Sequence, residues 1–369
     1  MATYKSIKYI IPTEAVEHTD SINALADVNT TTVAPSVGQT LKWSAANSIW
    51  QPADIEEAAA SGTQKALFGF GKRESGGRTN ITNLVSSSGV VASDTTGVGT
   101  ARDKLAASGY GGDKAIFGFG FIGNIRTSIT NLVSNLGVVA SDTTGVGTAR
   151  LGLAASGFGG DKAIFGFGSG TSTGSGYNNV TNLVSNVGVV ASDTTGVGSA
   201  RGDLAAAGYG GDKAIFGYGL KPGSGNNVKV SITNLVSNTG VVASDTTGVG
   251  SARFRLAAAG YGGDKAIFGY GDTGGISNGN YYSMTNLVSN TGVVASDTTG
   301  VGTTREQLAA TGYGGDKAIF GFGFNESYYI RNDLSVTNLV SNVGVVASDT
   351  TGVGTNRSEL AAAGYSTTA

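Results

Sequence analysis

The chain of 369 residues has no cysteine and one histidine, His18. A cysteine nucleophile, a Ser-His-Asp triad and a histidine-ligated metal site are therefore excluded as the basis of its activity. Charged residues make up 14% of the chain and the formal net charge is −2, which argues against nucleic-acid binding as its main task. No stretch approaches the roughly 20 apolar residues of a membrane span, and none keeps a helical period beyond two turns.

What the chain does have is repetition. The motif SDTTGVG occurs six times, with its aspartate at Asp94, Asp142, Asp193, Asp245, Asp297 and Asp349. A second motif, K-A-(I/L)-F-G-(F/Y)-G, begins at Lys65, Lys114, Lys162, Lys213, Lys265 and Lys317. The aspartates are 48 to 52 residues apart, and a fixed period in this range indicates a solenoid, a propeller or an array.

One copy illustrates the expected elements. Short strands are predicted at residues 153–158, 162–167, 181–185 and 189–191, all rich in small, β-branched or aromatic residues. Gly-Gly-Asp and Asn-Val-Gly separate the first pair and the last pair as tight turns, and a Gly/Ser/Asn-rich loop separates the two middle strands. Four short strands in about 50 residues is the proportion of a propeller blade.

The two chain ends distinguish a ring from a linear stack. The run at Lys65 precedes any good LAASGF run, and the last such run, at residues 360–365, has no K-A-I-F-G after it. If the C-terminal run completes the copy begun at Lys65, the ring closes and no sheet edge stays open. Residues 56–61 are a competing partner, but Glu56 and Glu57 suit an innermost strand poorly. We therefore predict an all-β, six-bladed β-propeller with four strands per blade, with a six-coil β-solenoid as the alternative.

The copies also resemble a known family. Arg150-x-x-Leu153-Ala-Ala, followed by Gly-Gly-Asp-Lys-Ala-Ile-Phe-Gly-Phe-Gly, is similar to the first two strands of a kelch blade. The resemblance covers roughly residues 63–365 and implies a kelch-like propeller. Small residues such as those of LAAAGY suit the innermost strands, because six strands converge on the axis.

The copies differ from one another in two places. One is the loop between the second and third strands, at residues 72–80, 121–128, 169–179, 220–231, 272–283 and 324–335. The other is the pair of residues after each repeated arginine, at residues 103–104, 151–152, 202–203, 254–255, 306–307 and 358–359. Antiparallel strand order places both at one end of a blade and the constant turns at the other. A rigid scaffold that presents diverse loops on one face is a common way to build a binding surface. Drift of unconstrained loops is the alternative.

The candidate ligand-binding residues are the aromatic and basic side chains of these variable positions. They are Arg73, Arg78, Arg126, Tyr177, Lys221, Lys229, Phe254, Tyr281, Tyr282, Tyr328, Tyr329 and Arg331. Tyrosine gives a large contact area at low entropy cost, which suits a glycan or another protein surface. The basic residues fit anionic groups of a cell envelope. For any one of them, an ordinary solvated side chain is the competing interpretation.

No cofactor, metal or enzymatic activity is expected. One aspartate per SDTTGVG motif falls short of the six to eight oxygens that Ca²⁺ prefers, so an Asx-turn on its own backbone is predicted instead. The repeated arginines, and the lysines of Asp-Lys, are expected to pair with or cover neighbouring blades. A glycosidase acid pair would have to come from scattered loop acids such as Glu74, Asp272, Glu326 and Asp333.

Residues 1–56 differ in composition, with both tryptophans and three of the four prolines. Residues 38–54 predict a hairpin around Ala-Ala-Asn-Ser, whereas the opening residues are too short an apolar run, interrupted by lysine, for a signal peptide. The segment from residue 25 to 54 resembles a short module of tail fibres and other structural proteins of tailed bacteriophages, and the opening looks like those of marine phage structural proteins. This implies a virion protein made in the host cytoplasm, anchored through Trp43 and Trp50. A plain hairpin capping the propeller is the alternative.

Taken together, the sequence predicts an anchoring arm over residues 1–56 and a propeller over 57–369. The expected function is host attachment as a tail fibre or receptor-binding protein of the phage particle. A capsid-decorating protein and, third, a depolymerase with loop carboxylates are the alternatives. The expected partners are other virion proteins through the arm, a host-surface glycan or protein, and further copies of the chain, since fibre-like parts are commonly trimers. Neither nucleic acid nor membrane insertion is expected.

Overall fold

The computed structural model describes residues 39–44, 49–54, 64–74, 77–170, 176–274, 280–327 and 330–366. The chain divides into two compact units, Met1–Ala60 and Ser61–Ala369. The division thus falls at Ala60 rather than at the predicted residue 56. Every regular element among the described residues is a β-strand, so the predicted all-β class is confirmed.

The described residues of the first unit form a hairpin. Strand β1 (Gln39–Ser44) pairs antiparallel with β2 (Ile49–Asp54), and the register sets Trp43 opposite Trp50. The hairpin predicted from the two alternating runs is therefore confirmed.

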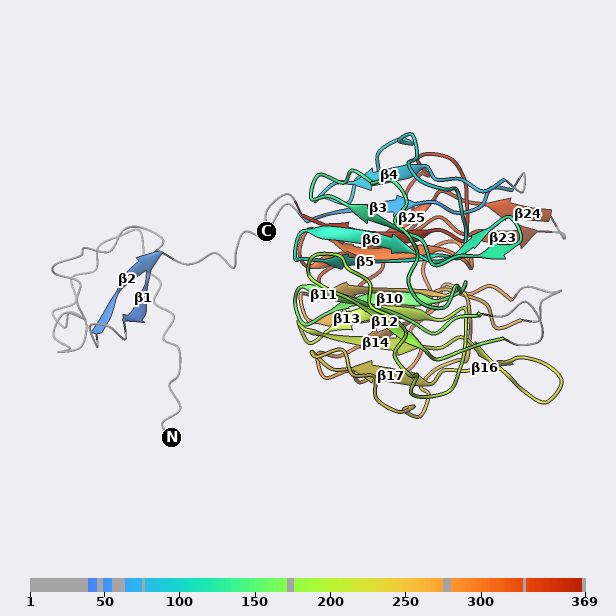
Figure 1. The fold of residues 1–369 in the computed structure, drawn as a ribbon. Coiled ribbons are helices and arrows are strands. Elements are labelled where there is room, and N and C mark those ends of the chain that lie inside the picture. The colour runs from blue at the N-terminus through green and yellow to red at the C-terminus, as the bar shows by residue number, and fades with distance from the viewer. Residues whose placement is uncertain are drawn as a thin grey trace. The chain divides into compact units, whose positions relative to one another are not determined.

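The second unit holds six three-stranded antiparallel sheets among the described residues (Figure 1). In each, a strand of small residues pairs with a K-A-I/L-F-G strand, which pairs in turn with a T-N-L-V strand. The sheets are β26 (Ala361–Tyr365), β3 (Lys65–Gly69), β4 (Thr82–Val85); β5 (Ala106–Tyr110), β6 (Lys114–Gly118), β9 (Thr130–Val133); β10 (Ala154–Phe158), β11 (Lys162–Gly166), β12 (Thr181–Val184); β13 (Ala205–Tyr209), β14 (Lys213–Gly217), β17 (Thr233–Val236); β18 (Ala257–Tyr261), β19 (Lys265–Gly269), β20 (Thr285–Val288); and β21 (Ala309–Tyr313), β22 (Lys317–Gly321), β25 (Thr337–Val340). Among the described residues, three small hairpins lie in variable loops: β7 (Phe121–Ile122) with β8 (Ile125–Arg126), β15 (Leu220–Lys221) with β16 (Val228–Lys229), and β23 (Phe324–Ser327) with β24 (Ile330–Asp333).

The strands of small residues contact one another in turn. Contacts run from β5 to β10, β13, β18, β21 and β26, and β26 also contacts β5. β26 pairs with β3 from Ala361↔Gly69 to Tyr365↔Lys65, although the two strands lie at opposite ends of this unit's sequence. The pairing of the C-terminal run with the run at Lys65 is thus confirmed.

The fourth predicted strand does not form as a regular strand. The segment after each Asn-x-Gly or Ser-x-Gly turn meets the T-N-L-V strand through isolated bridges, which in one copy are Val184↔Val190 and Thr181↔Thr194. Between these bridges Ala191 N donates to the Leu183 carbonyl at 2.8 Å, and Asp193 bonds to Thr148 of the preceding copy. Each sheet is therefore three regular strands with an irregular outer segment.

Close packing between neighbouring sheets explains one repeated glycine. A Cβ built on Gly118 would lie 2.8 Å from Cζ of Phe165 in the next sheet, so only glycine leaves room for that ring. Phe119 follows with φ of 63°, an unfavourable backbone region for an aromatic residue, and this brings its ring within 5.2 Å of the Phe165 ring centroid. The Arg150 guanidinium lies over the Phe119 ring, 4.3 Å from the ring centroid. Core packing thus joins each sheet to the next.

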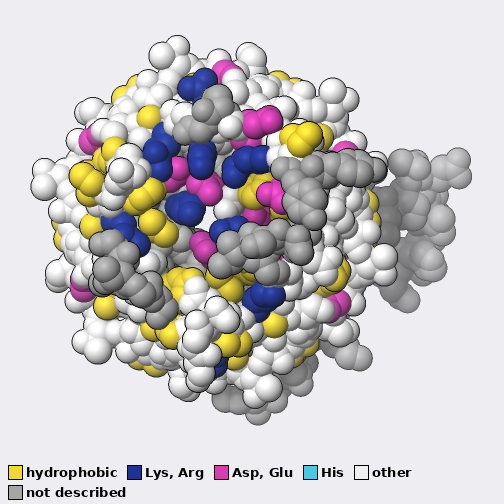
Figure 2. Space-filling view, turned by 90° about the vertical axis from the view of Figure 1, so that its right-hand side faces the viewer, with side chains coloured by type: hydrophobic (Ala, Val, Ile, Leu, Met, Phe, Trp, Pro, Cys, Tyr) yellow, Lys and Arg dark blue, Asp and Glu magenta, His cyan; other side chains and the backbone are white. Residues whose placement is uncertain are grey.

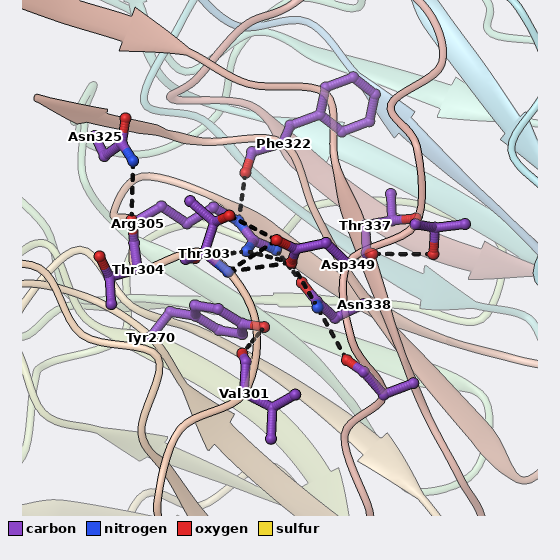
Figure 3. A network of polar contacts seen from close by, with 12 residues as sticks. Tyr270, Val301, Thr303, Thr304, Arg305, Phe322, Asn325, Thr337, Asn338 and Asp349 are labelled. Carbon is purple, nitrogen blue, oxygen red and sulfur yellow. Dashed lines mark hydrogen bonds and ion pairs between the residues drawn. The ribbon is translucent and has the colours of Figure 1, made fainter. Parts of the chain in front are cut away.

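A polar clasp joins neighbouring copies (Figure 3). Asp349 accepts hydrogen bonds from the backbone N and the Oγ1 of Thr303, at 3.0 to 3.1 and 2.6 Å, and from Asn338 Nδ2 at 2.9 Å. Arg305, which is fully buried, donates to Asn338 Oδ1 at 2.8 Å and lies over the Tyr270 ring at 4.2 Å. The threonine and arginine come from the copy before the aspartate, so the clasp spans two copies.

The prediction that the repeated aspartate caps its own backbone is therefore wrong, because the backbone N–H from which it accepts belongs to the preceding copy. Burial opposes ionisation of these aspartates, but the hydrogen bonds from threonine or serine and asparagine, and the arginine charge, hold the pKa of all six below its ordinary value. Burial lowers the pKa of Arg102, Arg150, Arg201 and Arg357 to about 10, against the charge of the clasped aspartate. The structural role predicted for the repeated arginines is confirmed.

Candidate functional site

The two variable positions of each copy lie together, as the strand order predicted. Isolated bridges join them in every copy: Asp103↔Phe121, Leu151↔Ser169, Gly202↔Leu220, Phe254↔Asp272, Glu306↔Phe324 and Lys72↔Ser358. The hairpins β15–β16 and β23–β24 extend from the same end of the unit (Figure 1). We call this end, built from the variable loops and the residue pairs after the arginines, the loop face.

Six residues form a ring at the centre of the loop face. They are the second residue after each repeated arginine: Lys104, Gly152, Asp203, Arg255, Gln307 and Glu359. Each has a positive φ of 52° to 61°. Each donates its backbone N–H to the carbonyl of the preceding member at 2.8 to 3.0 Å, and Lys104 donates to Glu359, which completes the circuit. We call these residues the axial ring.

Six leucines lie beneath the axial ring. They are Leu105, Leu153, Leu204, Leu256, Leu308 and Leu360, each only 5 to 6% exposed. Together with the ring they enclose a pocket of about 90 Å³. The pocket therefore has an apolar floor and a polar rim.

The rim charges balance. The axial ring has two cationic side chains (Lys104 and Arg255), two anionic ones (Asp203 and Glu359), one neutral one (Gln307) and one glycine. Lys104 Nζ lies 3.8 Å from Glu359 Oε1, and Arg255 Nε lies 3.9 Å from Asp203 Oδ2. Figure 2 shows basic and acidic side chains gathered around the central hollow of this face. The rim thus offers both donors and acceptors but no net charge.

Two buried acids stand next to the ring. Burial raises the pKa of Glu306 to about 7, although Arg255 Nη1 donates to its Oε1 at 2.8 Å. Burial and the charge of Glu359 raise the pKa of Asp103 to about 6, against Arg78, whose Nε lies 2.9 Å from Asp103 Oδ2. Glu306 Oε2 is buried and has no hydrogen-bond partner within the described part of the chain. These acids are poised to change charge near neutral pH.

Two of the predicted arginines are held in place by the protein itself. Arg78 pairs with Asp103 and lies over the Phe121 ring at 4.9 Å. Arg331 pairs with Asp333 at 3.1 Å, donates to Ser358 Oγ and lies 4.1 Å over the Phe324 ring. Their guanidinium groups help to order the loop face.

The other predicted cations have different surroundings. Arg126 Nε donates to the Ser169 carbonyl at 3.0 Å, and Lys229 Nζ donates to the Thr273 carbonyl at 2.5 Å, in each case in the next copy's loop. Lys221 is half-buried and Arg73 is exposed. Arg126 and Lys229 thus link adjacent loops without using up their charge on a carboxylate.

Three predicted tyrosines are half-buried on the loop face. Tyr177 accepts a hydrogen bond from Asn227 Nδ2 at 3.2 Å, and burial together with the charge of Asp203 raises its pKa to about 12. Tyr281 meets Phe324 edge-on at 5.9 Å, and Tyr282 accepts from Asn280 at 3.1 Å. They present aromatic surface beside the axial ring.

Phe254 is a correction to the predicted set. It is 1% exposed, because it packs beneath the loop that it bridges, so its side chain cannot meet a ligand. Tyr328 and Tyr329 lie outside the described residues.

Two of the four loop acids are buried and bonded to their own loops. Asp272, 2% exposed, accepts from the backbone N of Gly274 and Asn280 at 2.5 and 2.9 Å and so orders its own loop. Asp333, which is fully buried, pairs with Arg331. Glu74 and Glu326 are exposed. Within the described part of the chain, no group of three or more histidine, cysteine or acidic residues could hold a metal ion.

The opposite end carries the constant turns. Gly111 N donates to the Asp161 carbonyl at 2.7 Å, and equivalent bonds link each turn to the next copy's, with Ser366 N donating to Asp113. A well of about 340 Å³ opens here, lined by alanine and glycine of the inner strands and by five lysines of the turns. These lysines each pair with the preceding aspartate, as at Lys162 Nζ to Asp161 at 2.8 Å.

Sequence reasoning marked the residue pairs after the arginines as variable but did not single out Lys104, Asp203, Arg255, Gln307 or Glu359. Their convergence on one axis depends on the closed circuit of inner strands, which places residues about 50 positions apart side by side. Variation at a fixed place in every copy was the signal that pointed to them.

No protein-family model matches this chain, and no curated protein sequence matches it either. Across the described residues, no helix has the length and apolar character needed to cross a membrane.

Proposed function

We propose that the second unit is a six-bladed, kelch-like β-propeller. The contact circuit of the six inner strands, the pairing of β26 with β3 and the closed hydrogen bonding of the axial ring support this architecture. A solenoid would leave the first and last inner strands apart, whereas β26 and β5 are in contact.

We infer that the protein attaches a tailed-phage particle to its host, with the loop face binding a surface glycan or protein. The observation that carries this proposal is where the six copies differ. Their sequence differences gather at positions that bridge to one another on the loop face, while the turns at the other end repeat almost unchanged. Half-buried tyrosines and loop cations beside a polar hollow suit a polyhydroxylated ligand.

The arm would then tie the protein to the particle. We propose that residues 1–56, with Trp43 and Trp50, contact other virion proteins or sister chains, which would place the propeller on the virion as part of a homo-oligomer, such as a trimer. The resemblance of this segment to phage structural modules supports this placement.

One observation favours a second candidate function, that of a capsid-decorating or other structural virion protein. The copies keep an exposed valine at equivalent positions: Val90, Val138, Val189, Val241, Val293 and Val345, each 63 to 66% exposed. Six identical apolar side chains outside the core suit a protein–protein contact. In that function the loop differences would be incidental.

Loop replacement separates the two candidates. Replacing residues 169–179 and 220–231 with Gly/Ser segments of equal length should abolish adsorption of particles to host cells while particles still assemble. Asp161→Ala with Lys162→Ala, at the opposite end, is the matched control and should leave adsorption intact. Normal adsorption by the loop variant would contradict the attachment proposal.

A further inference from the structure

The pocket beneath the axial ring is too small for a whole ligand. Its volume of about 90 Å³ is well below the roughly 300 to 1,000 Å³ of sites that enclose a ligand. A ligand bound on the loop face could therefore place only a substituent of a few heavy atoms in it.

The lining defines the chemistry of that substituent. The floor of six leucines, each 5 to 6% exposed, favours an apolar end such as a methyl group. The rim has two cations and two carboxylates, Lys104 and Arg255 against Asp203 and Glu359, so it gives a full charge of either sign no advantage. A small neutral group that both donates and accepts hydrogen bonds matches this rim best.

An unused acceptor shows which donor fits the rim. Gln307 Oε1 belongs to the rim and is buried without a hydrogen-bond partner among the described residues. Buried acceptors are normally satisfied, so this oxygen calls for a donor. An amide N–H supplies one, and its carbonyl can accept from Arg255 or Lys104.

The rim has one member without a side chain. This is Gly152, and the Asp203 carboxylate lies over it, because a Cβ on Gly152 would stand 2.7 Å from Asp203 Oδ1. Tyr177 lies near this place, because a Cβ on Gly202 would stand 2.7 Å from Tyr177 Cε1 and 3.6 Å from the Gly152 carbonyl oxygen. An aromatic ring beside the rim offers a surface on which a sugar ring can rest while its substituent enters the pocket.

We propose that the axial ring and its leucine floor form a subsite for the acetamido group of an N-acetylated sugar. The methyl group would lie on the leucines, the N–H would meet Gln307 Oε1 or a rim carboxylate, and the sugar ring would lie beside Tyr177. This inference rests on the proposed glycan attachment and names the class of glycan.

The test uses the full chain and free sugars. Saturation-transfer NMR is run with N-acetylglucosamine, N-acetylgalactosamine and N-acetylmannosamine and with their non-acetylated parents. At least one acetylated sugar should bind about tenfold more tightly than its parent, with the strongest transfer at the acetyl methyl. Equal binding of all pairs, no binding of any, or transfer that avoids the methyl would each overturn the subsite.

A variant pair controls for folding. Gly152→Gln adds a side chain that Gln307 already carries in the same backbone conformation and displaces the Asp203 carboxylate from the rim, so it should abolish the preference for acetylated sugars. Gly160→Gln, at an open position with φ of 80° in a constant turn at the opposite end of the unit, should keep it. Host adsorption is measured on the same variants. If loop replacement abolishes adsorption but acetylated sugars bind no better than their parents, the subsite alone is overturned. If loop replacement leaves adsorption unchanged, the attachment function is overturned.

Discussion

Thr355 and Asp94 stand 261 residues apart, yet the backbone N of Thr355 lies 3.1 Å from both carboxylate oxygens of Asp94, and its Oγ1 donates to Asp94 Oδ2 at 2.5 Å. The same clasp joins each of the remaining pairs of successive copies, for example between Thr148 and Asp193. This contact therefore joins the last copy to the first in the way that the others join neighbours in sequence.

Removing this clasp should weaken the whole unit. Asp94→Ala deletes a charged acceptor and leaves the Thr355 N–H without it, which should lower the free energy of unfolding by about 1 to 3 kcal/mol. Urea denaturation followed by circular dichroism measures the change. Asp264→Ala is the control, because that aspartate pairs only at the surface with Lys265 and Asn290. A smaller loss for Asp94→Ala than for Asp264→Ala would contradict the closing role of the clasp.

The clasps should make the unit sensitive to acid. The pKa of each clasped aspartate is below its ordinary 3.8 in the folded chain, so its contribution is complete above pH 3.8 and is lost as pH falls through the lower folded value. Stability measured from pH 6 down to pH 2 should therefore decline below about pH 4. Asp94→Ala should show a shallower decline than the wild type, and an equally steep one would count against the clasp.

Glu306 should act in the opposite direction. Its pKa rises from 4.5 to about 7 on folding, so the folded chain holds a proton that the unfolded chain has lost, and stability falls as pH rises from 4.5 to 7. Glu306→Gln removes this fall, so the variant should gain stability relative to the wild type over that range. Asn325→Gln, on the same face without a titratable group, should run parallel to the wild type. If the free energies of unfolding of Glu306→Gln and the wild type differ by the same amount at every pH from 4.5 to 7, Glu306 is not buried as a protonated acid.

Gly118 should be intolerant of even a methyl group. Gly118→Ala places a Cβ 2.8 Å from Phe165 Cζ, and relieving that overlap should cost about 1 to 3 kcal/mol in the free energy of unfolding. Gly157→Ala is the matched control, since its nearest contact would be an ordinary 3.6 Å and its φ is not positive. Thermal denaturation of both variants compares them, and equal midpoints would contradict the packing described.

The last strand should be essential although it is terminal. Deleting residues 360–369 removes β26 and leaves β3 as an open sheet edge, so cooperative unfolding should be lost or the chain should aggregate. Deleting only residues 367–369 should leave the melting curve unchanged. If the protein with the longer deletion is monomeric and unfolds cooperatively, the fold of the second unit does not depend on β26.

Local patterns predicted the fold better than the site. The hairpin that sets Trp43 opposite Trp50 and the strand Lys65–Gly69 follow from alternation and turn residues that lie within one segment. The role of Asp193 does not follow from local patterns, because its donor, Thr148, lies 45 residues earlier in a different copy. The sequence predicted a regular outer strand at residues 189–191, where the structure has isolated bridges to the T-N-L-V strand instead.

The candidate site could not be predicted from local patterns, because contacts between different copies form it. Arg255 and Glu306 are ordinary loop residues in the sequence, and only the convergence of copies brings them within 2.8 Å. Phe254 shows the limit of composition, because an aromatic residue at a variable position was expected to meet a ligand and instead fills the core. Variation among copies identified the face, but burial decided which side chains are available on it.

Immunogold labelling of intact particles tests the account most directly. An antibody against the second unit should label the tail or fibre tips, and loop-face antibody fragments should block adsorption to host cells. Label spread over the capsid would favour the decorating function, and particles without any label would contradict the virion assignment on which the attachment proposal depends.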